Sequence, residues 1–161
     1  MGAPELVEQP SAVAHYLHPG QIVVTSTPGV ILTILGSCVA VCLWDARTGV
    51  AGVNHFLLPK NPLPGTEDAR YGDTAMESLL SAMWKRGAAV DGLVAKIFGG
   101  ACVLAVFSAR QQQSIGSQNI ELARRVLRER SIEIATDKTG GQRGRKVIFD
   151  TRDGSVWVKE L

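Results

Sequence analysis

The first third of the chain carries short apolar runs rich in valine and isoleucine, each bounded by glycine or proline. Runs of this length and composition are typical of β-strands, and the residues that bound them are typical of turns. The polar segment 45–49 has the composition of a hairpin turn, so the run after it should return alongside the run before it. The pattern predicts strands at 21–25, 30–33, 39–44 and 50–58.

The second part of the chain adds helical periodicity. The run Pro-Lys-Asn-Pro-Leu-Pro-Gly at 59–65 is incompatible with a central strand, so a surface loop is predicted, long enough to suggest a function. Apolar residues then recur at helical spacing from a cap at Asp73 or Thr74 as far as Gly87, and again over 119–130. Further strands are predicted at 93–98, 132–136, 146–149 and 155–158. This element order predicts an α+β fold in which two main helices cover mixed sheets.

Composition narrows the class of protein. The 161 residues suit one domain, with a flexible N-terminus at 1–11 and a single folded unit at 12–161. The net charge of +2 is too balanced to favour nucleic-acid binding, and no apolar run reaches the roughly 18 residues that a membrane helix needs. Three cysteines without close pairing fit a reducing compartment. We therefore expect a cytoplasmic protein without membrane insertion.

The most reactive residue of the sequence is expected at the corner Gly36-Ser37-Cys38. A cysteine behind a flexible Gly-Ser corner can stand clear of the sheet, with backbone N–H groups near Gly36 and Ser37 available to an oxyanion. The alternative is a free cysteine buried as a small hydrophobe. Cys102 is a second candidate thiol, and Cys42 is interpreted as core packing.

A histidine on the return strand strengthens the case for Cys38. His55 follows Cys38 by 17 residues, and if Trp44 pairs with Gly49 the two face each other with Cβ atoms about 5 Å apart. A register change of one residue would separate them onto opposite faces. A thiol nucleophile needs such a partner, because its reactive form is the thiolate.

Two further interpretations concern the support of this pair. His55 alone could equally be a core histidine. Thr33 precedes Cys38 by five residues, and its hydroxyl could orient the imidazole or belong to an ordinary β-branched strand residue. No zinc-ligand spacing and no phosphate-binding glycine motif is present, so neither a metal nor an organic cofactor is expected.

Specific motifs then relate the chain to a known family. Leu-Gly-Ser-Cys lies at 35–38 within the longer run Leu-Thr-Ile-Leu-Gly-Ser-Cys-Val-Ala-Val-Cys-Leu-Trp-Asp at 32–45, and Asn-His-Phe-Leu-Leu-Pro lies at 54–59. Weaker matches are Arg-Tyr-Gly-Asp at 70–73, Lys-Ile-Phe-Gly-Gly-Ala at 96–101, Ile115-Gly116 with Asn119, and Gly-Gly-Gln-Arg-Gly-Arg at 140–145. Over residues 20–160 the sequence resembles the chemoreceptor glutamine deamidases, the CheD family. Cys102 departs from the family pattern.

The resemblance implies a layered α/β sandwich and a Cys–His–Thr site, carried over to Cys38, His55 and Thr33. It implies a hydrolase of bacterial chemotaxis, a protein-glutamine glutaminase that converts selected glutamines of methyl-accepting receptors to glutamates and ammonia. The loop at 59–72 and the turn at 140–145 are candidates for gripping an acidic receptor helix, through Arg70, Arg143 and Arg145.

Two other functions remain open from the sequence. Members of the family can pair with a CheC-type phosphatase, so the chain could serve mainly as a binding module that regulates such a partner. A different thiol acyltransferase or protease would use a similar site.

Overall fold

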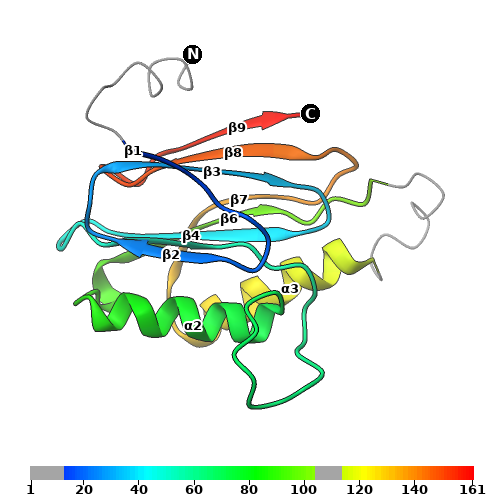
Figure 1. Ribbon diagram of the computed structural model, residues 1–161, viewed down its shortest axis with the longest axis horizontal. Coiled ribbons are helices and arrows are strands. Elements are labelled where there is room, and N and C mark those ends of the chain that lie inside the picture. The colour runs from blue at the N-terminus through cyan, green and yellow to red at the C-terminus, as the bar shows by residue number, and fades with distance from the viewer. Residues whose placement is uncertain (1–12, 104–113) are drawn as a thin grey trace.

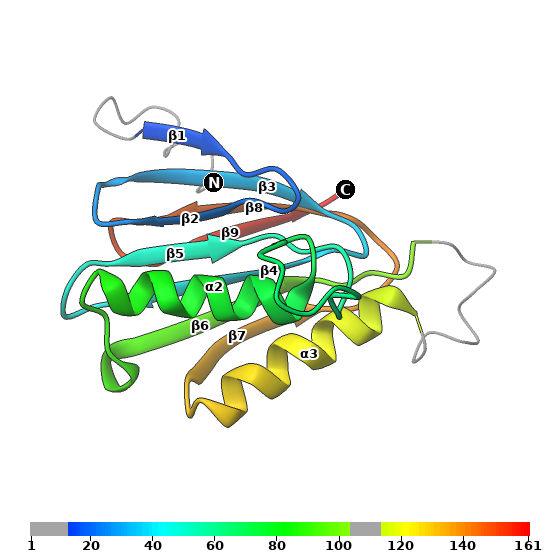
Figure 2. The ribbon, with the colours of Figure 1, turned by 60° about the horizontal axis from the view of Figure 1, so that its bottom comes forward.

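The protein, seen here in a computed structural model that describes residues 13–103 and 114–161, is built in three layers (Figure 1). Two sheets pack face to face, and both long helices lie on the outer side of one of them (Figure 2). The expected α+β layered sandwich is confirmed, although the helices cover only one of the two sheets. The expected flexible N-terminus at 1–11 lies outside the described residues.

The first sheet has four strands in the order β1-β3-β8-β9. Its strands are β1 (Val13–Tyr16), β3 (Gly29–Leu35), β8 (Arg145–Asp150) and β9 (Val156–Glu160). β3 runs antiparallel to β8 over six residue pairs, from Val30–Asp150 to Leu35–Arg145, and parallel to β1. The strand β1 was not among the predicted strands.

The second sheet has five strands in the order β2-β5-β4-β6-β7. Its strands are β2 (Ile22–Thr25), β4 (Val39–Asp45), β5 (Ala51–Asn54), β6 (Leu93–Gly99) and β7 (Glu133–Thr139). β4 is central and antiparallel to both β5 and β6, whereas β6 and β7 are parallel. The predicted β4–β5 hairpin is therefore present.

The two long helices are α2 (Gly72–Lys85) and α3 (Ile115–Glu129), and a single 3-10 turn, η1 (Val90–Gly92), precedes β6. α2 begins at Gly72 with Tyr71 as N-cap and no side-chain cap, so the predicted caps at Asp73 and Thr74 are wrong. A Cβ atom at Gly72 would collide with Phe56, so close packing explains the glycine. No helix in the described parts of the chain is long and apolar enough to cross a membrane.

α3 begins four residues earlier than the predicted 119, at Ile115, and Ser114 caps it by accepting from the Ser117 N–H group. Its first turn contains Gly116, whose missing side chain lets the helix approach the backbone of Gly100 and Ala101. This approach brings the first turns of α3 next to the corner that precedes β4.

Each side of the five-stranded sheet faces its own core. One cluster fills the space between that sheet and the helices and includes Val39, Val41 and Leu43 of β4. The other fills the space between the two sheets and includes Ala40 and Cys42, with Cys38 packed against it. Residues of β4 thus alternate between the two cores, as the two-residue period of a strand requires.

Candidate active site

The corner at 36–38 carries the chain from β3 in one sheet to β4 in the other, and the candidate residues gather around it. Thr33 on β3 faces the space between the sheets, as do its strand neighbours Ile31 and Leu35. His55, just beyond β5, reaches across from the opposite sheet, and its Nδ1 lies 2.7 Å from Thr33 Oγ1. The structure therefore brings Thr33 and His55 together across the inter-sheet core.

The hydrogen bonds around Thr33 determine which nitrogen of His55 carries the proton. The Thr33 hydroxyl donates to the Leu17 carbonyl oxygen at 2.8 Å, so its only hydrogen is already engaged. His55 Nδ1 must therefore be the donor to Thr33 Oγ1, which leaves Nε2 with a lone pair. Nε2 is buried and has no hydrogen-bond partner among the residues that the structure describes.

The protonation state of His55 follows from its surroundings. Burial, and to a smaller extent the electrostatic influence of His18, lowers the pKa of His55 to about 4. Only 2% of the His55 surface is exposed. At neutral pH the side chain is therefore an uncharged imidazole, a hydrogen-bond acceptor through Nε2.

Cys38 lies on the same side of the sheet as His55, but the predicted register is wrong by two residues. Trp44 pairs with Ala51, and an isolated bridge joins Val39 to Phe56, so Cys38 is opposite Leu57. A shift of two residues preserves the face, so Cys38 and His55 are diagonal neighbours instead of direct ones. The sulfur makes no hydrogen bond to Nε2, contrary to the close contact expected from direct pairing.

The cysteine corner is fixed through its carbonyl groups. The Gly36 carbonyl accepts from the Ala101 N–H at 2.8 Å, and the Cys38 carbonyl accepts from the Gly100 N–H at 2.8 Å. A side chain at Gly99 would collide with the Cys38 carbonyl, and Gly99 has φ 102°, so glycine is required there. No acceptor for the Ser37 N–H is found within 13–103 and 114–161.

The thiol is the most accessible group of the three. Cys38 is half-buried, whereas Thr33 and His55 are buried. Partial burial raises the pKa of Cys38, an effect that a hydrogen bond from its own backbone N–H partly offsets. The resting pair is therefore a neutral thiol beside a neutral imidazole.

Two buried asparagines that the sequence did not single out as site residues frame this arrangement. The Asn54 carboxamide oxygen accepts from the Val41 N–H at 2.9 Å, where a backbone carbonyl would serve in a regular ladder. Asn119 of α3 donates through Nδ2 to the carbonyls of Ser37, at 3.1 Å, and Leu57, at 2.9 Å. A polar residue on the buried face of a predicted helix was the available signal for Asn119.

The expected binding arginines lie in different environments. Arg145 is buried, and its guanidinium donates to the carbonyls of Gly99 at 3.0 Å and Gly140 at 2.7 Å. It holds two backbone turns together, and this structural role accounts for its buried guanidinium. Arg70 is exposed and pairs with Asp68 at 2.6 Å, and Arg143 is exposed.

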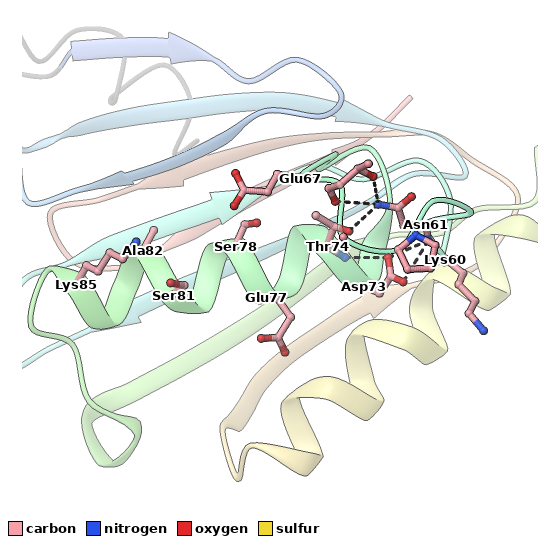
Figure 3. A pocket seen from close by; sticks show the side chains of 13 residues that line it. Lys60, Asn61, Glu67, Asp73, Thr74, Glu77, Ser78, Ser81, Ala82 and Lys85 are labelled. Atoms are coloured by element: carbon pink, nitrogen blue, oxygen red, sulfur yellow. Dashed lines mark hydrogen bonds between the residues drawn. The ribbon is translucent and has the colours of Figure 1, made fainter.

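The loop after His55 forms one wall of an open groove. Leu57 N donates to the Arg70 carbonyl at 2.8 Å, which closes the loop next to the strand of His55. Asn61 holds the loop to α2 through hydrogen bonds to Thr66 and Thr74 (Figure 3). The groove, of about 700 Å³, runs between this loop and the exposed side of α2 and includes Ser78, Ser81 and Ala82. Neither Cys38 nor His55 lines it.

The remaining cysteines are not placed for the same chemistry. Cys42 is buried between the sheets, and burial raises its pKa to about 12, so it packs as a small hydrophobe, as the sequence suggested. Cys102 is also buried, and its N–H donates to the Gly141 carbonyl at 2.9 Å. No cluster of three metal-ligating side chains occurs in the described portion of the chain.

Comparison with known proteins places this geometry in a family. The family model of CheD, described as chemotactic sensory transduction, matches residues 57–160. The probable chemoreceptor glutamine deamidase CheD 1 of Anaeromyxobacter dehalogenans is 47% identical over 146 residues, which cover 91% of this chain and 84% of that protein. The probable chemoreceptor glutamine deamidase CheD of Sulfurimonas denitrificans is 40% identical, over 89% of this chain and 92% of that protein.

Two further comparisons complete the picture. The probable chemoreceptor glutamine deamidase CheD of Trichlorobacter lovleyi is 46% identical, over 88% of this chain and 87% of that protein. A solved Neisseria meningitidis protein of family model DUF152 aligns with a TM-score of 0.49 at 14% identity, over 86% of this chain and 69% of that chain. On the family match and these identities, this chain belongs to the CheD family.

Proposed function

We propose that this protein deamidates selected glutamine side chains on the cytoplasmic domains of methyl-accepting chemoreceptors, giving glutamate and ammonia. The printed descriptions of its relatives, chemoreceptor glutamine deamidases, support the reaction and the substrate class. One observation supports the assignment of residues: Thr33 holds neutral His55 in one tautomer, with Nε2 unengaged on the sheet face that carries Cys38.

The first half of the reaction forms a thioester. Cys38 Sγ attacks the carbon of the glutamine carboxamide, and the thiol proton passes to His55 Nε2. Burial disfavours both the thiolate and the imidazolium, so an ion pair does not form before the attack. The proton therefore moves from Sγ to Nε2 as the carbon–sulfur bond forms. The oxyanion is held by the N–H groups of the corner, with Ser37 the best placed donor. The protonated imidazole then gives its proton to the departing nitrogen, which leaves as ammonia.

The second half hydrolyses the thioester. His55 Nε2, neutral again, accepts a proton from a water molecule, whose oxygen attacks the thioester carbon. The carbon–sulfur bond breaks, the proton returns to Cys38 and the glutamine has become glutamate. Thr33 contacts no reacting atom in this scheme, and its hydroxyl keeps Nε2 directed at the thiol through both steps. The scheme uses side chains and backbone groups of the protein together with one water molecule.

We further propose that the loop at 59–70 contacts the receptor helix. Both ends of the loop meet at Leu57 and Leu58, two and three residues after His55, so a chain that lies on the loop also lies near the thiol. The loop presents Leu63, 66% exposed, as an apolar contact. Arg143 supplies positive charge for an acidic helix, and exposed Arg70 can exchange its Asp68 partner for a receptor carboxylate. Arg145, which is buried, is not part of this proposal.

A purified receptor fragment incubated with the protein tests this function. Each modified glutamine should gain about 1 Da in the intact mass, with release of ammonia and no cleavage of peptide bonds. The change should require Cys38 and should persist with a metal chelator. Cleaved fragments would indicate a thiol protease. We propose binding of a CheC-type phosphatase as a second role of the protein. An unmodified receptor together with stable binding of such a phosphatase would indicate that the protein is only a regulatory binding module.

A further inference from the structure

Asn119 makes an unusual pair of contacts at the candidate active site. It is fully buried on the first turns of α3, and its single amide nitrogen donates to two carbonyls that belong to different segments. Ser37 directly precedes the nucleophile, and Leu57 follows His55 by two residues. One carboxamide therefore connects the segment that carries the thiol to the segment that carries the imidazole.

These contacts occur where the backbone ladder stops. Val39 and Phe56 exchange both backbone hydrogen bonds, at 3.1 and 3.0 Å, and form the last rung between the two segments. Beyond it the chains diverge, since the N–H groups of Leu57 and Leu58 both turn to the Arg70 carbonyl. The carbonyls of Ser37 and Leu57 are left without a cross-strand donor, and Asn119 supplies one to each.

The orientation of the carboxamide is fixed by its surroundings. Both carbonyls are acceptors, so only the nitrogen of Asn119 can face them, and a rotated amide would place oxygen against oxygen. Asn119 Oδ1 is then buried and has no hydrogen-bond partner among the described residues. A residue selected only for stability would avoid an unsatisfied buried acceptor. The free-energy cost of burying Oδ1 without a partner suggests that the two hydrogen bonds from Nδ2 have a role in the active site.

We propose that Asn119 is a positioning residue for the deamidation, one that fixes the separation of Cys38 and His55 by holding their two segments at the end of the ladder. It contacts neither reacting side chain and acts through the backbone at Ser37 and Leu57. The inference rests on the proposed function for its kinetic consequence only. Its structural consequence, an altered environment of the Cys38 thiol, holds whatever the substrate.

The test uses Asn119→Ala and the isosteric Asn119→Asp in the full-length protein. Misplacement of catalytic groups by about 1 Å can cost on the order of 100-fold in rate. We therefore expect kcat on the receptor fragment to fall about 10- to 100-fold in Asn119→Ala, with KM within about threefold of wild type. Asn119→Asp keeps the volume, but an ionised carboxylate donates neither bond and places oxygen against both carbonyls, so its kcat should fall at least as far as in Asn119→Ala.

A second readout does not depend on the receptor. The alkylation rate of Cys38 by iodoacetamide, followed by mass spectrometry from pH 6 to pH 10, reports how far the imidazole assists the thiol. Both Asn119 variants should shift this profile toward that of His55→Ala. The matched control is Thr151→Val at the other end of β8, because the Thr151 hydroxyl also lies within hydrogen-bond distance of two carbonyl oxygens, of Thr27 at 3.0 Å and Gly29 at 3.1 Å, and donates its one hydrogen between them.

The outcomes distinguish a positioning role of Asn119 from a purely structural one. The control should lower the melting temperature and leave kcat, KM and the alkylation profile unchanged. If the folded Asn119 variants behave like that control, Asn119 is merely structural and the inference is wrong. If Asn119→Ala does not fold, Asn119→Asp gives the same decision. If wild type leaves every receptor glutamine unchanged, the proposed function fails, and the alkylation profile still decides the role of Asn119.

Discussion

Replacing Thr33 with valine removes one hydroxyl and changes the side-chain volume little, so it isolates the hydrogen bonds of this residue. The Leu17 carbonyl loses its donor and His55 Nδ1 loses its acceptor, both in the inter-sheet core. An unsatisfied buried group costs about 1–3 kcal/mol. We expect Thr33→Val to lower the free energy of unfolding by about 2 kcal/mol.

The effect on catalysis should exceed what this stability loss explains. Without Thr33 Oγ1, His55 is free to carry its proton on Nε2, the tautomer that cannot accept the thiol proton. General base catalysis typically raises the reaction rate about 10²- to 10⁴-fold, and part of this gain depends on the Thr33 hydroxyl that orients the base. We therefore expect kcat for deamidation to fall about 10- to 100-fold, with KM little changed.

The assay combines ammonia release with nitrogen NMR of the imidazole. Wild type should show a protonated Nδ1 and an unprotonated Nε2 near neutral pH, and Thr33→Val should show a mixture. Thr33→Ser keeps the hydroxyl and should retain most of the activity. If Thr33→Val is as active as Thr33→Ser with an unchanged tautomer, Thr33 does not orient His55.

Three further outcomes follow from the same site. Cys38→Ala should abolish ammonia release and keep the fold, while Cys42→Ala should cost roughly 1 kcal/mol of stability and remain active; the reverse pattern would move the nucleophile. The folded-state pKa of His55, about 4, lies below the usual value of about 6.5, so the unfolded chain binds a proton between these values that the folded chain does not. The contribution of His55 to the free energy of unfolding is thus complete above about pH 6.5 and declines toward pH 4, by at most about 3 kcal/mol. Urea unfolding of wild type and of His55→Gln at both pH values measures this decline. An equal pH dependence in the two proteins would exclude His55 as its cause. Shortening the loop within 60–67 should reduce receptor modification while Cys38 still reacts with iodoacetamide; a parallel loss of both would mean that the loop supports the site itself.

The sequence predicted most strands because their valine and isoleucine runs are local signals, and it predicted the β4–β5 hairpin from its turn. The predicted β4–β5 register was wrong by two residues. A hydrogen bond from the Asp45 N–H to the Val50 carbonyl, 2.9 Å long, closes the turn, and the composition of the turn does not specify this bond. The error did not disturb the face of Cys38, because a shift of two residues preserves strand alternation. The sheet face on which Cys38 lies could therefore be predicted from the sequence, whereas the residue of β5 opposite each residue of β4 could not.

The support of the site lay beyond local reasoning. No local pattern shows that β3 and β4, joined by a short corner, belong to different sheets, so the contact of Thr33 with His55 needed tertiary structure. Arg145 looked like a surface arginine in a glycine-rich turn, but the turns around Gly99 and Gly140 enclose it. Asn119 acts on a segment more than 80 positions earlier, a separation that only the folded chain closes.

The division of the site between two sheets also sets when the enzyme can first become active during synthesis. Thr33, Cys38 and His55 all lie in the first 55 residues and leave the ribosome early. β3, however, is held on one side by β8, over six residue pairs that involve residues 145–150, and β8 is in turn held by β9. Because pairings of such long sequence separation form late, the nascent chain carries the three proposed catalytic residues in an inactive arrangement until its final strands are made.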